Sequence, residues 1–226
     1  MIGWLLAMVL QGPDPLATAE RELAAGNLEA AVSAFTSALA DPGIPPGPVL
    51  ANLGRCAMQL NRPAEAIWYL RRAQLRLPDD ATIAADLQLA EAACGFDGQD
   101  RPQPGVLDRI GSSELLWTGA ALQAAGLLLL ILGAGRTRKF GVALTAAGVL
   151  THGLVATRLW FPSAPLAVVL APRTELLQEP RLGAGIVIPL HAGDLVTVVG
   201  TNDTFAEVTH PRGRGHLPLL QLGIIN

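Results

Sequence analysis

The sequence predicts a chain of three modules: helical repeats, a pair of apolar helices, and a small all-β domain. A unit of about 35 residues recurs in the first hundred residues, two long uncharged runs follow, and the last sixty residues contain short β-branched runs between turns. Hydrophobic residues make up 50% of the chain and charged residues 15%, against roughly 25% in ordinary soluble domains. The apolar excess must therefore be packed or lie in lipid. Net charge divides the same way: −5 over residues 1–110, +3 over 111–161 and −1 over 162–226.

The first ten residues, MIGWLLAMVL, form a short apolar run that a turn-rich Gly-Pro-Asp-Pro segment follows. This pattern resembles the hydrophobic region of a secretory signal, although the α-amino group is its only positive charge. We expect residues 1–12 to export the segment that follows them, whether or not they are cleaved. The alternative is an apolar first helix that packs on the helical domain.

Residues 13–94 show helical periodicity, and residues 26–39 align with residues 61–74 at an offset of 35. Small residues let antiparallel helices approach where they cross, and larger apolar residues fill the space beyond the crossing. The predicted packing positions are Ala31, Phe35, Ala38, Leu53, Gly54, Ala57, Ala66, Leu70, Ala73 and Pro78. The pattern resembles the tetratricopeptide repeat, whose period is 34. Residues 79–94 then form the first helix of a third repeat or a capping helix, and residues 95–112 form a linker.

The resemblance implies that the first helices of the repeats line a peptide-binding groove. The candidate groove residues are Leu16, Glu20, Asn52, Arg55, Gln59 and Leu89. Members that bind a carboxylate carry several Lys, Arg and Asn residues there. Here Glu20 and Asp86 accompany Asn52 and Arg55, which argues against such a clamp. A mainly structural or weakly docking role for the repeats stays open.

Two cysteines, Cys56 and Cys94, fall on neighbouring predicted helices. They are too few for a disulfide framework or a zinc ribbon. An exported domain could oxidise the pair, but a free cysteine often packs as a small hydrophobic residue. We expect two thiols.

Residues 113–161 are predicted to form a transmembrane hairpin. Residues 115–135 are 21 uncharged residues, which span about 31 Å as a helix, and residues 140–157 span about 27 Å. These lengths approach the thickness of a hydrocarbon core, and the four-residue link between the runs requires an antiparallel pair. The alternative is a pair of buried core helices.

Charge in the link predicts the orientation of the hairpin. The link carries the cations Arg136, Arg138 and Lys139, and the positive-inside rule places such a segment in the cytoplasm. Trp117 and Trp160 then fall at the outer interface, a layer that indole rings favour. Both flanking modules are therefore expected outside the cytoplasm.

Residues 165–226 are predicted to form an all-β domain of about five short strands. Runs at 167–170, 186–188, 195–199 and 205–208 are β-branched and are separated by turns rich in Gly, Pro, Asn and Asp. This suits a small barrel. The segments 188–198, 205–208 and 213–218 resemble bacterial SH3-like domains in their order. That resemblance implies a barrel fold, and binding of cell-wall peptidoglycan peptides is known for some relatives.

Several function classes lack a sequence signal. No G-x-S-x-G, H-E-x-x-H, P-loop or dinucleotide fingerprint occurs, so we expect no catalytic residue, no metal site and no cofactor. A net charge of −3 and a single lysine exclude a basic nucleic-acid surface.

The order of modules resembles the BatE-type proteins of bacterial aerotolerance (Bat) operons. This resemblance implies a non-catalytic scaffold anchored in the bilayer of the bacterial inner membrane, with its repeats and SH3-like domain on the outer side. It also implies protein partners, namely von Willebrand factor A-domain Bat-type proteins and a MoxR-type ATPase system, in envelope stress or assembly. A peptidoglycan sensor is the alternative reading, and cytoplasmic repeats acting as an adaptor are a third.

Overall fold

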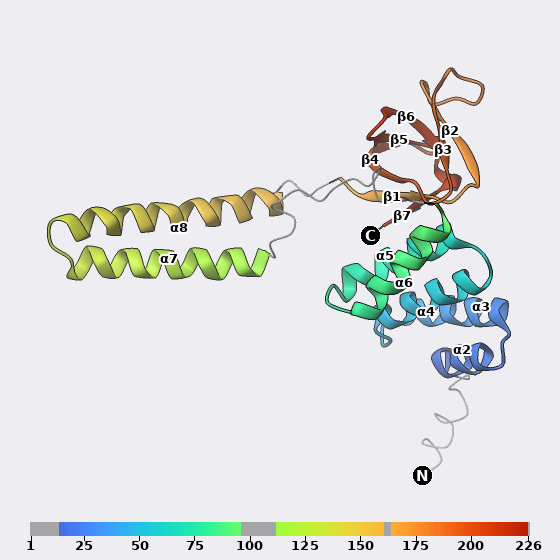
Figure 1. Cartoon of the computed structure of the whole chain (residues 1–226), viewed down its shortest axis with the longest axis horizontal. Coiled ribbons are helices and arrows are strands. Elements are labelled where there is room, and N and C mark those ends of the chain that lie inside the picture. Colours follow the sequence, from blue (N-terminus) through green and yellow to red (C-terminus); the bar gives the residue numbers. More distant parts are fainter. Residues whose placement is uncertain (1–13, 96–111, 161–163, 226) are drawn as a thin grey trace, which may run out of the picture. The chain divides into compact units, whose positions relative to one another are not determined.

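The computed structural model describes residues 14–95, 112–160 and 164–225, with the side chains of residues 116–156 in the middle segment (Figure 1). The expected export segment at 1–12 and most of the linker lie outside the described residues. The chain divides into two compact units: the two outer segments together form one, and the middle segment forms the other. Each unit is described by itself.

Five helices form the repeats, and their starts follow from local sequence. They are α2 (Pro15–Ala24), α3 (Leu28–Leu39), α4 (Pro46–Gln59), α5 (Pro63–Arg76) and α6 (Ala81–Ala93). Three of them begin with proline, whose fixed φ suits the first helical position and whose missing N–H has no partner to lose there. The predicted repeat is confirmed as helical repeats in this segment.

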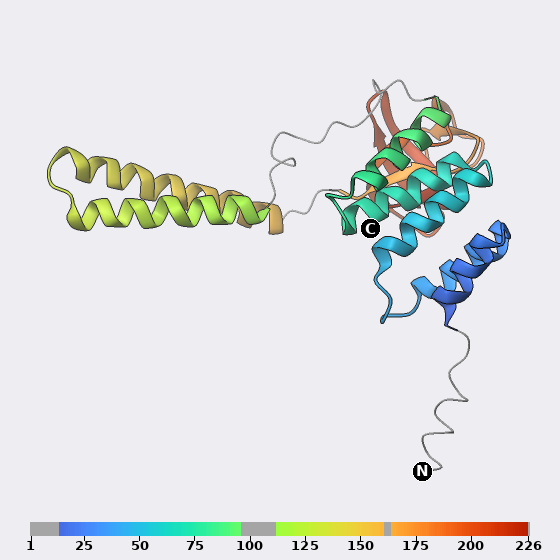
Figure 2. The same ribbon diagram turned by 60° about the horizontal axis from the view of Figure 1, so that its bottom comes forward.

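Helix pairs α2–α3 and α4–α5 pack antiparallel, as Figure 2 shows. Gly54 of α4 makes the second crossing close, because a Cβ on it would lie 2.6 Å from Cγ of Leu70 on α5. The first pair encloses Ala31, Phe35 and Ala38, which are 0% exposed. The predicted packing positions other than Pro78 are likewise buried, and Pro78 directly follows the C-cap of α5.

The second unit is a helical hairpin of α7 (Ser112–Leu132) and α8 (Arg136–Trp160). Its turn is residues 133–135, so the cations expected in the link instead open α8. Gly135 has φ +61°, a conformation that glycine adopts readily, and it lets the chain reverse before Arg136. By length and composition, the described residues contain one helix able to cross a membrane, Arg136–Ala156, and a shorter apolar helix, Leu116–Leu132.

Glycines bring the two helices of the hairpin close together. A Cβ on Gly126 would lie 2.8 Å from the carbonyl oxygen of Gly141, and one on Gly148 would lie 2.8 Å from that of Gly119. Large apolar side chains point away from this contact and are more than half exposed: Leu127, Leu128, Ile131, Leu132, Phe140, Val142, Val149 and Leu150. The pair therefore packs through small residues and presents an apolar outer surface.

The last segment is an antiparallel all-β sheet, as predicted. Its strands are β1 (Leu166–Val169), β2 (Arg173–Leu177), β3 (Ile186–His191), β4 (Leu195–Thr201), β5 (Phe205–His210), β6 (Gly213–Pro218) and β7 (Leu222–Ile224), in the order β3-β2-β6-β5-β4-β1-β7. Strand β2 was not expected, and β6 begins inside residues 211–215, whose proline and two glycines indicate a turn by composition. Gly215 is needed in β6, since a Cβ there would lie 2.8 Å from Cγ of Leu176.

The sheet and the repeats share a core, so they are not separate modules. Strands β1 and β7 pack against α5 (Figures 1 and 2). Val168, Leu195 and Ile225 of the sheet join one buried cluster with Ile67 and Leu87 of the repeats. The hairpin is thus an insertion within a single unit.

Candidate binding sites

A pocket opens on the repeats where α4, α5 and α6 meet. Its volume is about 200 Å³, and it is lined by Arg55, Met58, Gln59, Leu70, Asp86 and Leu89. Met58, Leu70 and Leu89 supply apolar surface, and Leu89 is 64% exposed. We call these six residues the repeat pocket.

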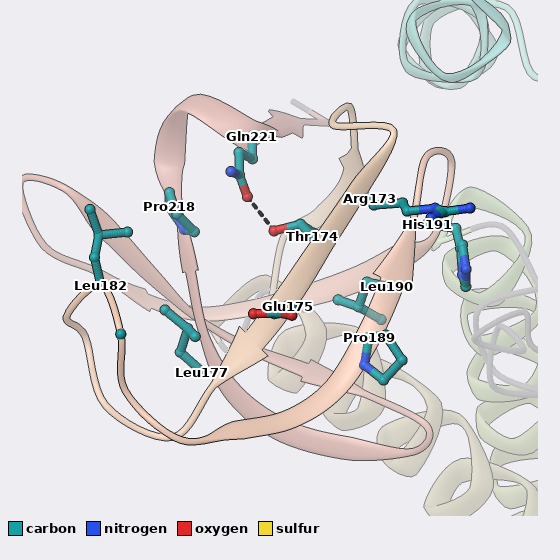
Figure 3. A pocket seen from close by; sticks show the side chains of 11 residues that line it. Arg173, Thr174, Glu175, Leu177, Leu182, Pro189, Leu190, His191, Pro218 and Gln221 are labelled. Carbon is teal, nitrogen blue, oxygen red and sulfur yellow. Dashed lines mark hydrogen bonds between the residues drawn. The ribbon is translucent and has the colours of Figure 1, made fainter.

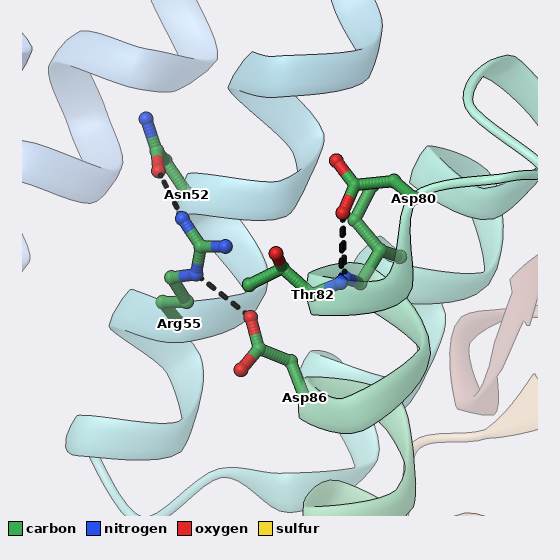
Figure 4. Close-up of polar contacts among 6 residues, drawn as sticks. Asn52, Arg55, Asp80, Thr82 and Asp86 are labelled. Atoms are coloured by element: carbon green, nitrogen blue, oxygen red, sulfur yellow. Dashed lines mark hydrogen bonds and ion pairs between the residues drawn. The ribbon is translucent and has the colours of Figure 1, made fainter.

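Polar contacts neutralise the one cation of the repeat pocket (Figure 4). Nε of Arg55 donates to Oδ2 of Asp86 over 2.7 Å, and Nη1 donates to Oδ1 of Asn52 over 3.2 Å. The guanidinium is therefore already paired with a carboxylate. A carboxylate ligand would therefore have to compete with Asp86 for this cation.

Asp80 fixes the start of the helix that carries Asp86 and Leu89. Its Oδ1 accepts hydrogen bonds from the backbone N–H groups of Thr82, over 2.8 Å, and of Ile83, over 3.3 Å (Figure 4). These donors stabilise the carboxylate and hold the pKa of Asp80 below its usual value. The cap therefore stabilises the first turn of α6, the helix that forms one wall of the pocket.

The sequence identified the repeat pocket in part. Arg55, Gln59 and Leu89 line it, and Asn52 contacts Arg55. Leu16 is half-buried against the core of the first helix pair, and Glu20 is exposed on α2 outside the pocket. Sequence reasoning predicted Leu70 only as a packing position, and it missed Met58, although Met58 lies three residues after Arg55 and therefore near it on the same helix face.

A second pocket, of about 400 Å³, lies on the β domain (Figure 3). Its lining combines charged and polar groups with leucines and prolines: Arg173, Thr174, Glu175, Leu177, Leu182, Gly183, Pro189, Leu190, His191, Pro218 and Gln221. Arg173 and Glu175 are two residues apart on β2, so both side chains project from the same face of the sheet. Thr174 donates a hydrogen bond to Gln221, which ties β2 to the segment before β7. None of these residues is among the sequence candidates for binding: β2, which supplies four of them, was not expected, and Pro189, Leu190 and His191 were expected only as part of the barrel fold.

The remaining sequence candidates concern topology and thiols. Arg136, Arg138 and Lys139 are exposed in the first turn of α8, and Trp117 on α7 is 77% exposed. Trp160 ends α8, and its side chain lies outside the described ones. Cys56 and Cys94 are free thiols. Among the described residues, no three potential ligands come together to hold a metal ion.

Comparison with known proteins identifies the repeats. Residues 22–90, which include α3 to α5 and most of α6, match the family model of the tetratricopeptide repeat. No curated protein and no solved structure shows significant similarity to the chain. Tetratricopeptide repeats suggest a protein–protein interaction scaffold, and the family is typically non-catalytic.

Proposed function

We propose that the chain is a non-catalytic, membrane-anchored scaffold that binds a protein partner in the repeat pocket on the outer side of the bacterial inner membrane. The observation that carries the proposal is the chemistry of this pocket on a tetratricopeptide-repeat surface: an apolar floor beneath a polar rim whose charges balance.

The repeat pocket suits one apolar side chain of a partner. Met58, Leu70 and Leu89 supply apolar surface, while Gln59 and the Arg55–Asp86 pair supply polar groups. Protein interfaces combine a desolvated apolar centre with a polar rim in this way. An exposed leucine at the mouth adds apolar area that becomes buried when a partner binds.

Apolar side chains on the outside of the α7–α8 pair support anchoring in a bilayer. The contact between the helices is made by glycines, so the larger apolar side chains are left facing outward. A soluble hairpin would bury such a surface, whereas lipid tails solvate it. Helix pairs in membranes commonly meet through small residues.

The shared core of repeats and sheet supports two crossings. If only one of the two helices crossed, residues 14–95 and 165–225 would lie on opposite sides of the membrane, and they could not form one unit. Over its 21 residues, α7 reaches about 31 Å, enough to return the chain across the hydrocarbon core. The cations at the start of α8 favour a cytoplasmic turn, which leaves the soluble unit outside.

The resemblance to BatE-type proteins suggests the partners. A von Willebrand factor A-domain Bat-type protein is the candidate for the repeat pocket, and a MoxR-type ATPase system would act with that complex. The role would lie in envelope stress or assembly.

Site-specific photocrosslinking in intact membranes tests the binding proposal. A photoreactive amino acid replaces Leu89 in the pocket or, as a control, Leu75 of α5, which is 61% exposed and does not line the pocket. The proposal expects one A-domain protein to crosslink from position 89 and not from position 75. Met58→Arg, which fills the pocket, should abolish the adduct. An adduct of equal yield from both positions, or none from position 89, would contradict it.

The β-domain pocket supports a second candidate function, binding of a cell-wall peptide. Peptidoglycan peptides carry ammonium and carboxylate groups, and Glu175 and Arg173 offer the opposite charges on one strand face. Full-length protein in detergent should then sediment with purified cell walls. The double change Arg173→Gln with Glu175→Gln should leave it in the supernatant, while Arg212→Gln, at an exposed site outside the pocket, should not. Sedimentation that is equal in all three proteins would exclude the pocket.

A further inference from the structure

We infer that the β domain is the C-terminal cap of the repeat array: β1 and β7 take the place of the second helix that would complete a third repeat after α6. The cap packs directly on α5 and shares a buried cluster with α6, and through these contacts it shapes the repeat pocket that the helices form. The packing of the β domain on the repeats does not depend on the proposed function. The effect of the cap on partner binding in the repeat pocket does rest on that function.

Helix α6 resembles the first helix of a repeat that lacks its second helix. It packs on α5, as the first helix of a repeat packs on the preceding one, and it buries Ile83, Leu87 and Ala90. In a repeat array the next helix would cover such a face, because each unit buries its core only against its neighbours. Here Val168 and Ile225 of the β domain belong to the same buried cluster.

The contact between cap and array has specific geometry. Nε1 of Trp68 on α5 donates to the backbone carbonyl oxygen of Ile224 over 2.8 Å. The neighbouring Gly223 lies under the indole, since a Cβ there would lie 2.7 Å from Cγ of Trp68. The guanidinium of Arg72 lies 5.2 Å from the ring centroid, in the range of a cation–π contact. We call these contacts the junction. Its hydrogen bond, required glycine and stacked cation make it a specific contact.

Contacts between the β domain and the repeats extend to Cys94, at the end of α6. This residue is the C-cap of α6 and packs on the shared cluster. Burial, with Asp194 and Glu91 nearby, raises the pKa of its thiol to about 11. Asp194 stands in the turn between β3 and β4, so the β domain contributes to the environment of this thiol. Cys94 can therefore report whether the cap is seated on α6.

The reactivity of Cys94 in the full-length protein in detergent tests the cap. Gly223→Val places a side chain against the Trp68 ring, while Gly200→Val is the matched control, because nothing lies closer than 4.0 Å to a Cβ there. If the cap lifts, the pKa of Cys94 falls from about 11 towards its ordinary value of 9.0. The thiolate fraction at pH 8 then rises about 100-fold, and the lower nucleophilicity of the weaker base reduces the gain to roughly tenfold. Improved access adds to this.

We expect alkylation of Cys94 to accelerate at least about tenfold in Gly223→Val and to stay unchanged in Gly200→Val. Cys56, which is buried on α4 in the cluster that includes the first helix pair, should react slowly in both variants. Trp68→Phe keeps an aromatic ring but loses the hydrogen bond and part of the indole surface, so it should give a smaller acceleration than Gly223→Val in a folded protein. Unchanged reactivity of Cys94 in both junction variants would overturn the inference, as would an equal rise at Cys56. No partner is present in this experiment, so its failure is distinct from failure of the binding proposal.

Discussion

Replacing Gly54 with alanine should destabilise the repeats, although alanine is the better helix former. Helix propensity alone favours Gly54→Ala by about 1 kcal/mol. The new Cβ, however, would lie 2.6 Å from Cγ and 2.8 Å from Cδ2 of Leu70. Leu70 is 0% exposed and cannot swing into solvent. Overpacking of this kind costs about 1–3 kcal/mol, so we expect a net loss of about 1 kcal/mol.

The effect of Gly54→Ala on stability should change from a loss to a gain when Leu70 is replaced by alanine. Leu70→Ala alone costs about 3 kcal/mol through lost burial and the cavity it leaves. In that background the alanine at position 54 no longer meets Cγ and Cδ atoms of Leu70, which are its three nearest neighbours, so it keeps its helical advantage and fills part of the cavity. The double variant should therefore be about 1 kcal/mol more stable than Leu70→Ala, a coupling of about 2 kcal/mol.

Amide hydrogen exchange of α4 and α5 in the full-length, detergent-solubilised protein measures these opening free energies peptide by peptide. The two single variants, the double variant and the parent complete the cycle. A gain of about 1 kcal/mol from Gly54→Ala in both backgrounds would refute the reasoning, because only propensity would then be at work.

Three further outcomes follow from the structure. Arg71→Met should destabilise α5 and α6 by about 1–3 kcal/mol in hydrogen exchange, because it removes the guanidinium that binds Glu91 over 2.6 Å while the carboxyl stays 4% exposed. Adding Glu91→Gln should recover much of the loss, and no recovery would refute burial of charge as the cause. The Asp80 cap lowers the pKa of that carboxyl, so the stability it adds is present above the pKa of the carboxyl in the unfolded chain and is lost as pH falls through its pKa in the folded protein. Amide exchange at the start of α6 should rise over that pH range in the parent protein and not in Asp80→Asn. Identical pH profiles would contradict the cap. Gly126→Val should lower the melting temperature of the hairpin in detergent, because the new side chain would meet the backbone of α8. The control Gly153→Val should not, since nothing lies within 4 Å of a Cβ there. Equal melting temperatures of the two variants would argue against close helix contact.

Local signals account for the parts of the fold that the sequence predicted. Alanine at regular helical spacing marks the crossings, as at Ala31 and Ala66, and prolines mark three helix starts. The strands around Val196 and Val208 follow from β-branched runs. These features depend on neighbours within a few residues, so a single sequence contains them.

Long-range pairing accounts for what the sequence analysis missed. Strand β6 contains Gly213 and Gly215, which indicate a turn by composition, and only the close approach of β2 explains why a glycine is needed. The junction joins Trp68 to Ile224, 156 residues apart. The repeat pattern predicts that Trp68 packs within the repeats. No residue near Trp68 in the sequence indicates that its partner is Ile224.

The repeat pocket falls between these cases. Helical spacing places Arg55, Gln59 and Leu89 on first-helix faces. The acidic Asp86 near them argues against a carboxylate clamp. The direct pairing of Arg55 with Asp86 depends on how α4 and α6 pack. The β-domain pocket is lined in part by β2, whose sequence Arg-Thr-Glu-Leu-Leu contains a single β-branched residue, Thr174, and ends with two leucines that break the alternation of a half-buried strand.

The location of residues 14–95 and 165–225 outside the cytoplasm is the central proposal, and cysteine labelling in intact spheroplasts tests it most directly. Single cysteines at Asp79 in the repeats, Asp203 in the β domain and Arg138 at the start of α8 are introduced into a chain carrying Cys56→Ala and Cys94→Ala. A membrane-impermeant maleimide should label positions 79 and 203 from outside, and position 138 only after the membrane is opened. Labelling of position 138 in sealed spheroplasts, or of only one of the other two, would contradict the account.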